Sequence, residues 1–195
     1  MLHSTTNANE YNNKEFHLKQ NSQNPFENKV FIDCTFHNSS FDHCNWKNTQ
    51  FIDCTFIECN INMPSMENCR LQDTLFKESK LSGVNFYLCT PTFFATSYQN
   101  TTLQYCNFSD LKMNHTLFES CKIKECYFNN TSLKSVKFKD SELPETLFHN
   151  SDLSKADFST ATQYDINPQN NKLSKARFSL PEAARLLSHF EIIIE

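Results

Sequence analysis

The sequence predicts an all-β solenoid whose chain turns a corner every five residues. Large apolar residues recur with this period 13 times from Phe26 to Phe86 and, after a slip of two residues, 14 times from Phe93 to Phe158. A period of five fits neither an α-helix nor an uninterrupted strand, so each pentad must contain its own turn. The residue two places before each apolar centre is usually small, which predicts a second inward-facing position in every pentad.

The cysteines occupy this small inward position. A free cysteine behaves as a small, readily buried residue, so we expect reduced thiols that fill the interior. The nine cysteines are Cys34, Cys44, Cys54, Cys59, Cys69, Cys89, Cys106, Cys121 and Cys126.

Composition argues against several classes of function. A single glycine is too few for phosphate-binding loops, and no serine-histidine-aspartate order or H-E-x-x-H helix is present. We therefore predict a protein that is not an enzyme and has no cofactor and no metal. The net charge of −4 argues against direct binding of nucleic acid. The chain shows neither a span of roughly 20 apolar residues nor the apolar core of a secretory signal, so we expect a cytoplasmic protein.

Two pentads carry a family resemblance. Residues Ser151–Lys155 (SDLSK) and Ala156–Thr160 (ADFST) follow the order small residue, Asp, then Leu or Phe, then two polar residues. This pattern resembles the pentapeptide-repeat family. The resemblance implies a right-handed quadrilateral β-helix with four pentads in each coil.

Coils of four pentads can be tested on the sequence, because centres separated by four pentads must then stack. Two opposite columns come out mainly aromatic, and the intervening ones mainly aliphatic. The first column contains Phe36, Phe56, Phe76, Tyr98, Phe118, Phe138, Phe158 and Phe178. The opposite column contains Phe26, Trp46, Met66, Phe86, Phe108, Phe128 and Phe148. Because the column identity survives the slip, we expect residues 87–97 to bulge outward as a surface loop.

The ends of the pattern define the expected domains. Residues 1–24 form a polar, partly disordered segment, residues 25–178 the β-helix with an irregular stretch at 159–172, and residues 179–195 a C-terminal helix and strand. Ser179 and Glu182 resemble a capping box around Pro181. In relatives the same element closes a two-fold dimer, and the alternative is a cap folded over its own last coil. The predicted dimerisation residues are Leu180, Ala183, Leu186, Leu187, Phe190, Ile192 and Ile194.

Acidic residues recur at one coil spacing in the N-terminal half. Asp33, Asp53 and Asp73 should stack on one corner about 4.8 Å apart, with Glu58 and Glu78 on the next. Such rows either form a solvated acidic edge or imitate the phosphates of DNA. Lysines concentrate in the other half, so any mimicry is asymmetric along the rod. These are Lys112, Lys122, Lys124, Lys134, Lys137 and Lys139.

A narrower resemblance suggests a partner. The pentad Ser82–Phe86, the bulge after it, the break at Tyr164–Pro168 and the closing Phe178–Pro181 segment are similar to the quinolone-resistance (Qnr) and microcin B17-immunity branch. The resemblance implies binding to DNA gyrase or topoisomerase IV and protection from quinolones or gyrase-poisoning toxins. On the loop, Tyr87, Thr92 and Phe94 are candidate contacts, with Phe94 either an exposed anchor or a filler under the loop. The alternative function is a scaffold β-helix for an unrelated protein partner.

Overall fold

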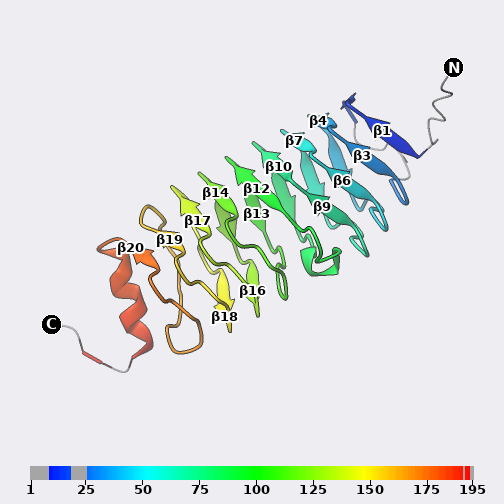
Figure 1. Cartoon of the computed structure of the whole chain (residues 1–195). Coiled ribbons are helices and arrows are strands. Elements are labelled where there is room, and N and C mark those ends of the chain that lie inside the picture. Colours follow the sequence, from blue (N-terminus) through cyan, green and yellow to red (C-terminus); the bar gives the residue numbers. More distant parts are fainter. Residues whose placement is uncertain (1–8, 19–25, 191, 194–195) are drawn as a thin grey trace, which may run out of the picture.

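The chain forms a rod of stacked coils, with β1 (Glu10–Asn12) near one end and β20 (Arg177–Phe178) near the other (Figure 1). The structure, a computed structural model, describes residues 9–18, 26–190 and 192–193. Strands of successive coils pair in parallel and build sheets that run along the rod. The fold is the predicted right-handed, four-sided β-helix.

The strands fall into four sheets. The first contains β1 (Glu10–Asn12), β3 (Val30–Ile32), β6 (Gln50–Ile52) and β9 (Arg70–Gln72). The second and longest contains β2 (Glu15–Phe16), β4 (Thr35–His37), β7 (Thr55–Ile57), β10 (Thr74–Lys77), β12 (Thr96–Gln99), β14 (Leu117–Glu119), β17 (Lys137–Lys139), β19 (Asp157–Phe158) and β20 (Arg177–Phe178). The third contains β5 (Ser40–Asp42), β8 (Asn60–Asn62), β11 (Lys80–Ser82), β13 (Thr102–Gln104) and β15 (Lys122–Lys124). The fourth contains β16 (Tyr127–Asn129) and β18 (Leu147–His149).

The register confirms coils of four pentads with one insertion. Phe36 pairs with Phe56, whereas Phe76 pairs with Tyr98, so the coil between them is two residues longer. The extra residues follow the short 3-10 helix η1 (Phe86–Leu88): the Thr90 N–H still donates to the Cys69 carbonyl at the usual offset, whereas Thr96 already pairs with Thr74. The stack therefore continues across the insertion without a change of sheet.

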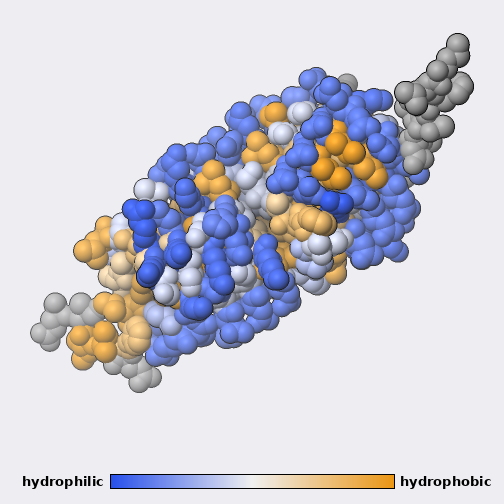
Figure 2. All heavy atoms as spheres, viewed as in Figure 1, coloured by the Kyte–Doolittle hydropathy of each residue, from blue (hydrophilic) through white to orange (hydrophobic). Residues whose placement is uncertain are grey.

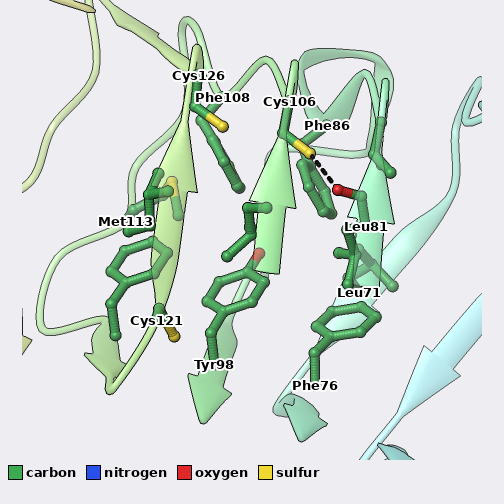
Figure 3. Packing of buried hydrophobic residues seen from close by; sticks show 14 of the residues in the cluster. Leu71, Phe76, Leu81, Phe86, Tyr98, Cys106, Phe108, Met113, Cys121 and Cys126 are labelled. Atoms are coloured by element: carbon green, nitrogen blue, oxygen red, sulfur yellow. Dashed lines mark hydrogen bonds between the residues drawn. The ribbon is translucent and has the colours of Figure 1, made fainter. Parts of the chain in front are cut away.

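Rings of successive coils pack face to face in the interior (Figure 3). In the second sheet, the ring of Phe118 stacks on Tyr98 at 4.8 Å and on Phe138 at 4.9 Å between centroids. In the opposite column, Phe108 stacks on Phe86 at 4.5 Å and on Phe128 at 4.8 Å. These contacts confirm the two aromatic walls and leave a filled interior.

The small inward residues satisfy the buried backbone. The Ser79 hydroxyl donates to the Lys77 carbonyl at 2.8 Å and accepts from the Cys59 N–H of the coil before it at 2.9 Å. Cysteine thiols make weaker contacts of the same kind, as Cys54 does with the Phe31 carbonyl. Eight cysteines are buried as predicted, but Cys44 is only half-buried.

The β-helix begins earlier than predicted. Strands β1 and β2 add part of another coil, in which Tyr11 stacks on Phe31 and Phe16 stacks on Phe36. Residues 9–18 thus belong to the rod rather than to a polar leader. The predicted disorder of the remaining N-terminal residues falls on 1–8 and 19–25, outside the described residues.

At the insertion, Phe94 and not the in-phase Phe93 points into the interior. Phe93 is 63% exposed, whereas Phe94 is 6% exposed and packs edge-on against Phe86 at 6.1 Å. Phe94 is therefore a filler under the loop, and the exposed-anchor alternative was wrong for this residue. The two-residue slip occurs at the turn before Phe94, which places Phe94 rather than Phe93 over the interior.

The C-terminal element also differs in detail. Its helix, η2 (Glu182–His189), is a 3-10 helix without a side-chain cap, so the predicted capping box does not form. Glu182 instead accepts a hydrogen bond from the Gln163 N–H at 3.0 Å and pairs with Arg185. Residues Ile192 and Ile193 are not in a strand, and the rest of the predicted strand lies outside the described residues. The irregular stretch 159–172 still follows the coil, with Tyr164 and Ile166 fully buried.

Candidate functional site

One corner of the rod carries a row of aspartates. Asp33, Asp53 and Asp73 are exposed and have left-handed backbone with φ of 51°, 52° and 47°. The strands before them pair in register, so the three residues occupy equivalent places on successive coils, one strand spacing apart. Glu58 and Glu78 form a second row on the next corner, also exposed and left-handed. The structure thus places these five carboxylates as predicted; whether they bind a partner remains a prediction.

Apolar side chains flank the aspartate row. Figure 2 shows apolar atoms gathered over β3 and β6, where Val30, Ile32 and Ile52 are half-exposed. On the other side of the row, between the two acidic corners, Ile57 and Leu75 are also half-exposed. A surface that combines carboxylates with aliphatic groups suits a protein partner better than a small ion.

Carboxylates at the corners and on the strand positions differ in their neutralisation. Among the described residues, Asp33, Asp53, Asp73 and Glu58 form no ion pair, and Glu78 contacts only Lys77, at 3.6 Å. The corner carboxylates Asp110, Asp140 and Glu145 of the C-terminal half are likewise unpaired among the described residues. Most carboxylates at strand positions of that half instead pair with a cation of a neighbouring coil. These pairs are Lys139 with Glu119, Lys134 and Lys172 with Asp152, and Arg177 with Asp157.

Asp152 illustrates the neutralised strand positions. Burial alone would raise the pKa of its carboxyl, but the Ser154 N–H at 3.0 Å and the ammonium groups of Lys134 and Lys172 outweigh burial. The pKa of Asp152 is lowered to about 2. The pKa of Asp157 is lowered in the same way: burial opposes the shift, while Ser159 and Arg177 favour it.

The loop projects beside the acidic corner. Tyr87 is 45% exposed, and Thr92 and Phe93 are exposed on the same insertion. The Phe93 ring lies over the Arg70 guanidinium, 4.8 Å from it, and Arg70 also donates to Gln72. Of the predicted contacts, Tyr87 and Thr92 reach the surface and Phe94 does not. Sequence reasoning missed Phe93, for which the adjacent Phe-Phe pair was the available signal.

The C-terminal helix exposes an apolar surface at the end of the rod. Leu180 is 84% exposed and Leu187 40% exposed, and Phe190 and Ile192 are also exposed. Leu186 and Ala183 are half-buried, and Leu186 packs against the core of its own chain. The predicted dimerisation residues therefore divide into an inward and an outward set, and Ile194 lies outside the described residues. The helix contacts the last coil through His189, whose Nε2 lies 2.6 Å from Oδ1 of Asp165.

In the part of the chain that the structure describes, no three histidine, cysteine or acidic side chains converge closely enough to hold a metal ion. Neither described helix has the length and apolar character that would let it cross a bilayer.

Comparison with known proteins places this geometry in a class. Residues 29–93 match the family described as pentapeptide repeat region, and residues 88–148 match the SV2A/B/C luminal domain. A structure of QnrB1, described as a plasmid-mediated fluoroquinolone resistance protein, is similar over 95% of this chain and 97% of its own, with 16% identity and a TM-score of 0.55. HetL, a pentapeptide repeat protein of the cyanobacterium Nostoc involved in heterocyst differentiation regulation, is similar over 88% of this chain and 84% of its own, with 11% identity and a TM-score of 0.41. No curated protein matches the sequence.

The five-residue corners, the parallel stack and the filled interior define a β-helix built from pentads. Residues 29–93 thus match the pentapeptide-repeat family, and the β-helix as a whole has the fold of QnrB1.

Proposed function

We propose that this protein binds a type II topoisomerase, DNA gyrase or topoisomerase IV, at the surface where the enzyme holds DNA, and so counteracts quinolones or gyrase-poisoning toxins. The observation that carries the proposal is the pair of stacked, largely unneutralised carboxylate rows on adjacent corners of the N-terminal half. The fold shared with QnrB1, itself a fluoroquinolone resistance protein, supports the choice of partner. The proposed action is binding in the cytoplasm and not catalysis, because the interior is filled by side chains.

The geometry allows a partial imitation of DNA. The two rows provide five charges over three coils of about 4.8 Å each, because Asn38 occupies the corner beside Asp33, whereas duplex DNA carries one charge for each ~1.7 Å of its axis. Stacked like charges repel each other, by about 0.5 kcal/mol for each adjacent pair in physiological salt. Asparagine would satisfy the same left-handed corners without that repulsion. The presence of aspartate at three successive corners therefore favours a role in binding.

The test is a supercoiling assay with purified DNA gyrase and a fluoroquinolone, with and without this protein. We expect the protein to restore supercoiling or to lower the amount of drug-stabilised cleavage complex. Replacing Asp33, Asp53 and Asp73 together by Asn should weaken binding to gyrase about tenfold or more, while raising stability by about 1 kcal/mol. The unchanged protein failing to alter inhibition or cleavage would refute the proposed function.

A matched control removes three charges elsewhere. Asp110, Asp140 and Glu145 are exposed left-handed corner residues of the C-terminal half. The variant carrying Asp110→Asn, Asp140→Asn and Glu145→Gln should bind gyrase as well as the unchanged protein does. Equal losses of gyrase affinity in the two triple variants would indicate a general effect of net charge and would contradict a specific role of the aspartate row.

We further propose that two copies pair through the outward apolar residues of the C-terminal helix. Leu187→Glu should convert a dimer into a monomer in analytical ultracentrifugation, because a carboxylate would be buried in the apolar contact. Leu147→Glu is the control, since Leu147 is similarly exposed but lies on the side of the rod. A monomer at all concentrations of the unchanged protein would contradict this assembly.

A further inference from the structure

A hollow opens on the aspartate corner beside the loop. Its volume is about 360 Å³, and it extends across three successive coils. Its lining includes the apolar Phe94, Ala95 and Leu117 together with Asp73 and His115. We refer to this hollow, defined by these five residues, as the Ala95 notch. The other lining residues are polar: Thr74, Thr96, Ser97, Asn114 and Thr116.

The notch exists because the insertion changes the corner residue. Thr74 pairs with Thr96, so Ala95 occupies the coil position that Asp73 occupies one coil earlier. Ala95 presents only a methyl group between the longer side chains of Asp73 and His115, and the corner is therefore recessed there. The backbone at this place is satisfied, since the Ala95 N–H donates to Leu71 and its carbonyl accepts from Thr74, each at 3.0 Å. Side chains, not backbone, are thus available to a ligand.

The charge in the notch is negative and unneutralised. Asp73 has no ion-pair partner among the described residues. Arg70, the nearby cation on β9, is engaged with the Phe93 ring and with Gln72. Asp53 and Asp33 continue the same row and extend the negative field toward the N-terminus.

We propose that the Ala95 notch receives one arginine or lysine side chain of the partner protein. The aliphatic part of such a side chain would pack on Phe94, Ala95 and Leu117, while its cationic end would pair with Asp73. Three apolar residues beside one carboxylate match these two parts of a long basic side chain. The inference rests on the proposed function, because it names the chemistry by which the acidic surface recognises its topoisomerase.

The first test uses a small probe and no topoisomerase. N-acetyl-arginine amide is titrated into the isotopically labelled full chain at pH 7.5, with N-acetyl-citrulline amide as the uncharged isostere. We expect the amide resonances of Ala95, Thr96 and Ser97 to shift with the arginine probe and not with the citrulline probe. Asp73→Asn should abolish the shifts, whereas Asp53→Asn, an identical charge change one coil away, should preserve them. Unshifted notch resonances, or equal effects of the two substitutions, would overturn the inference.

The second test measures binding to gyrase with the same pair of variants. Asp73→Asn should weaken binding about tenfold, and Asp53→Asn about two- to threefold. Ala95→Leu should weaken binding as strongly as Asp73→Asn, because its side chain fills the notch while leaving every charge in place. Equal affinity of the Ala95→Leu variant and the unchanged protein would refute occupation of the notch even if gyrase binding is confirmed. Occupation by the arginine probe without any binding to gyrase would instead refute the proposed partner.

Discussion

The aromatic column makes a quantitative prediction about stability, with Phe118 as its most informative member. The Phe118 ring is fully buried and stacks on Tyr98 and Phe138 with interplanar angles of 3° and 11°. It also meets Phe108 and Phe128 edge-on, at 6.3 and 6.2 Å between centroids. Phe118→Ala removes all four aromatic contacts from the middle of the rod.

The expected loss of unfolding free energy is about 4 kcal/mol. Replacing a buried phenylalanine by alanine costs about 3–5 kcal/mol, and the cost is highest where the surroundings cannot collapse into the cavity. Here strand pairing on both sides fixes the separation of the coils, because Phe118 is in register with both Tyr98 and Phe138. The lost stacked and edge-on contacts favour the upper part of the range.

A graded series provides the control. Phe178 is half-buried at the end of the column, with ring contacts to Phe158 and Tyr164 only, so Phe178→Ala should cost about 2 kcal/mol. Phe93→Ala should cost less than about 0.5 kcal/mol, because its ring is exposed. The assay is equilibrium unfolding in urea under reducing conditions, monitored by circular dichroism. A cost for Phe118→Ala no greater than that for Phe93→Ala would refute the stacked interior.

Two further predictions concern titration and thiol access. Because the pKa of Asp152 is about 2 in the folded chain and close to 4 when unfolded, its ionised form stabilises the fold above about pH 4, and this contribution disappears as the pH falls through about 2. Asp152→Asn should therefore cost about 1–2 kcal/mol at pH 7 and nothing at pH 2, as measured by urea unfolding; a cost independent of pH would contradict the assignment. Cys44, the half-buried thiol, should be alkylated before the other eight cysteines, yet more slowly than a free thiol, because burial and the neighbouring Asp42 raise its pKa. Mass spectrometry of the folded chain showing rapid labelling at Cys59 or Cys121 would contradict the buried thiols.

The interior could be predicted well from the sequence alone because every coil places side chains of similar size at equivalent inward positions. Centres separated by four pentads occupy equivalent places, so Phe36, Phe56 and Phe76 must have similar volumes if the column is to be filled. The same repetition placed the carboxylate row, since Asp33 and Asp53 follow centres that stack. The same rule could have predicted the earlier start of the β-helix, because Tyr11 and Phe16 are in phase with Phe26. The polar Asn21, at the in-phase position between Phe16 and Phe26, interrupts the apolar pattern.

Departures from the repeat were predicted less well because they depend on contacts between distant residues. A two-residue insertion can be absorbed at several points, and the pairing of Thr74 with Thr96 decides that Phe94 and not Phe93 turns inward. The capping pattern at Ser179 and Glu182 is a local signal. The Glu182 carboxylate does not form that local cap because it accepts a hydrogen bond from the Gln163 N–H, which is distant in the sequence.

The left-handed corners connect the fold to the surface chemistry. Among the described residues, 27 non-glycine residues have positive φ, and the single glycine, Gly83, accounts for one more corner. Asparagine and aspartate tolerate this conformation best, so an Asp at a corner needs no functional explanation when considered alone. Glutamate has no such advantage, yet Glu58 and Glu78 occupy successive corners beside the aspartate row, as Glu125 and Glu145 do in the other half of the rod. The backbone therefore accounts for the polarity of these corners but not for their negative charge. The proposed binding to a cationic partner surface would explain why two such rows lie side by side in the N-terminal half.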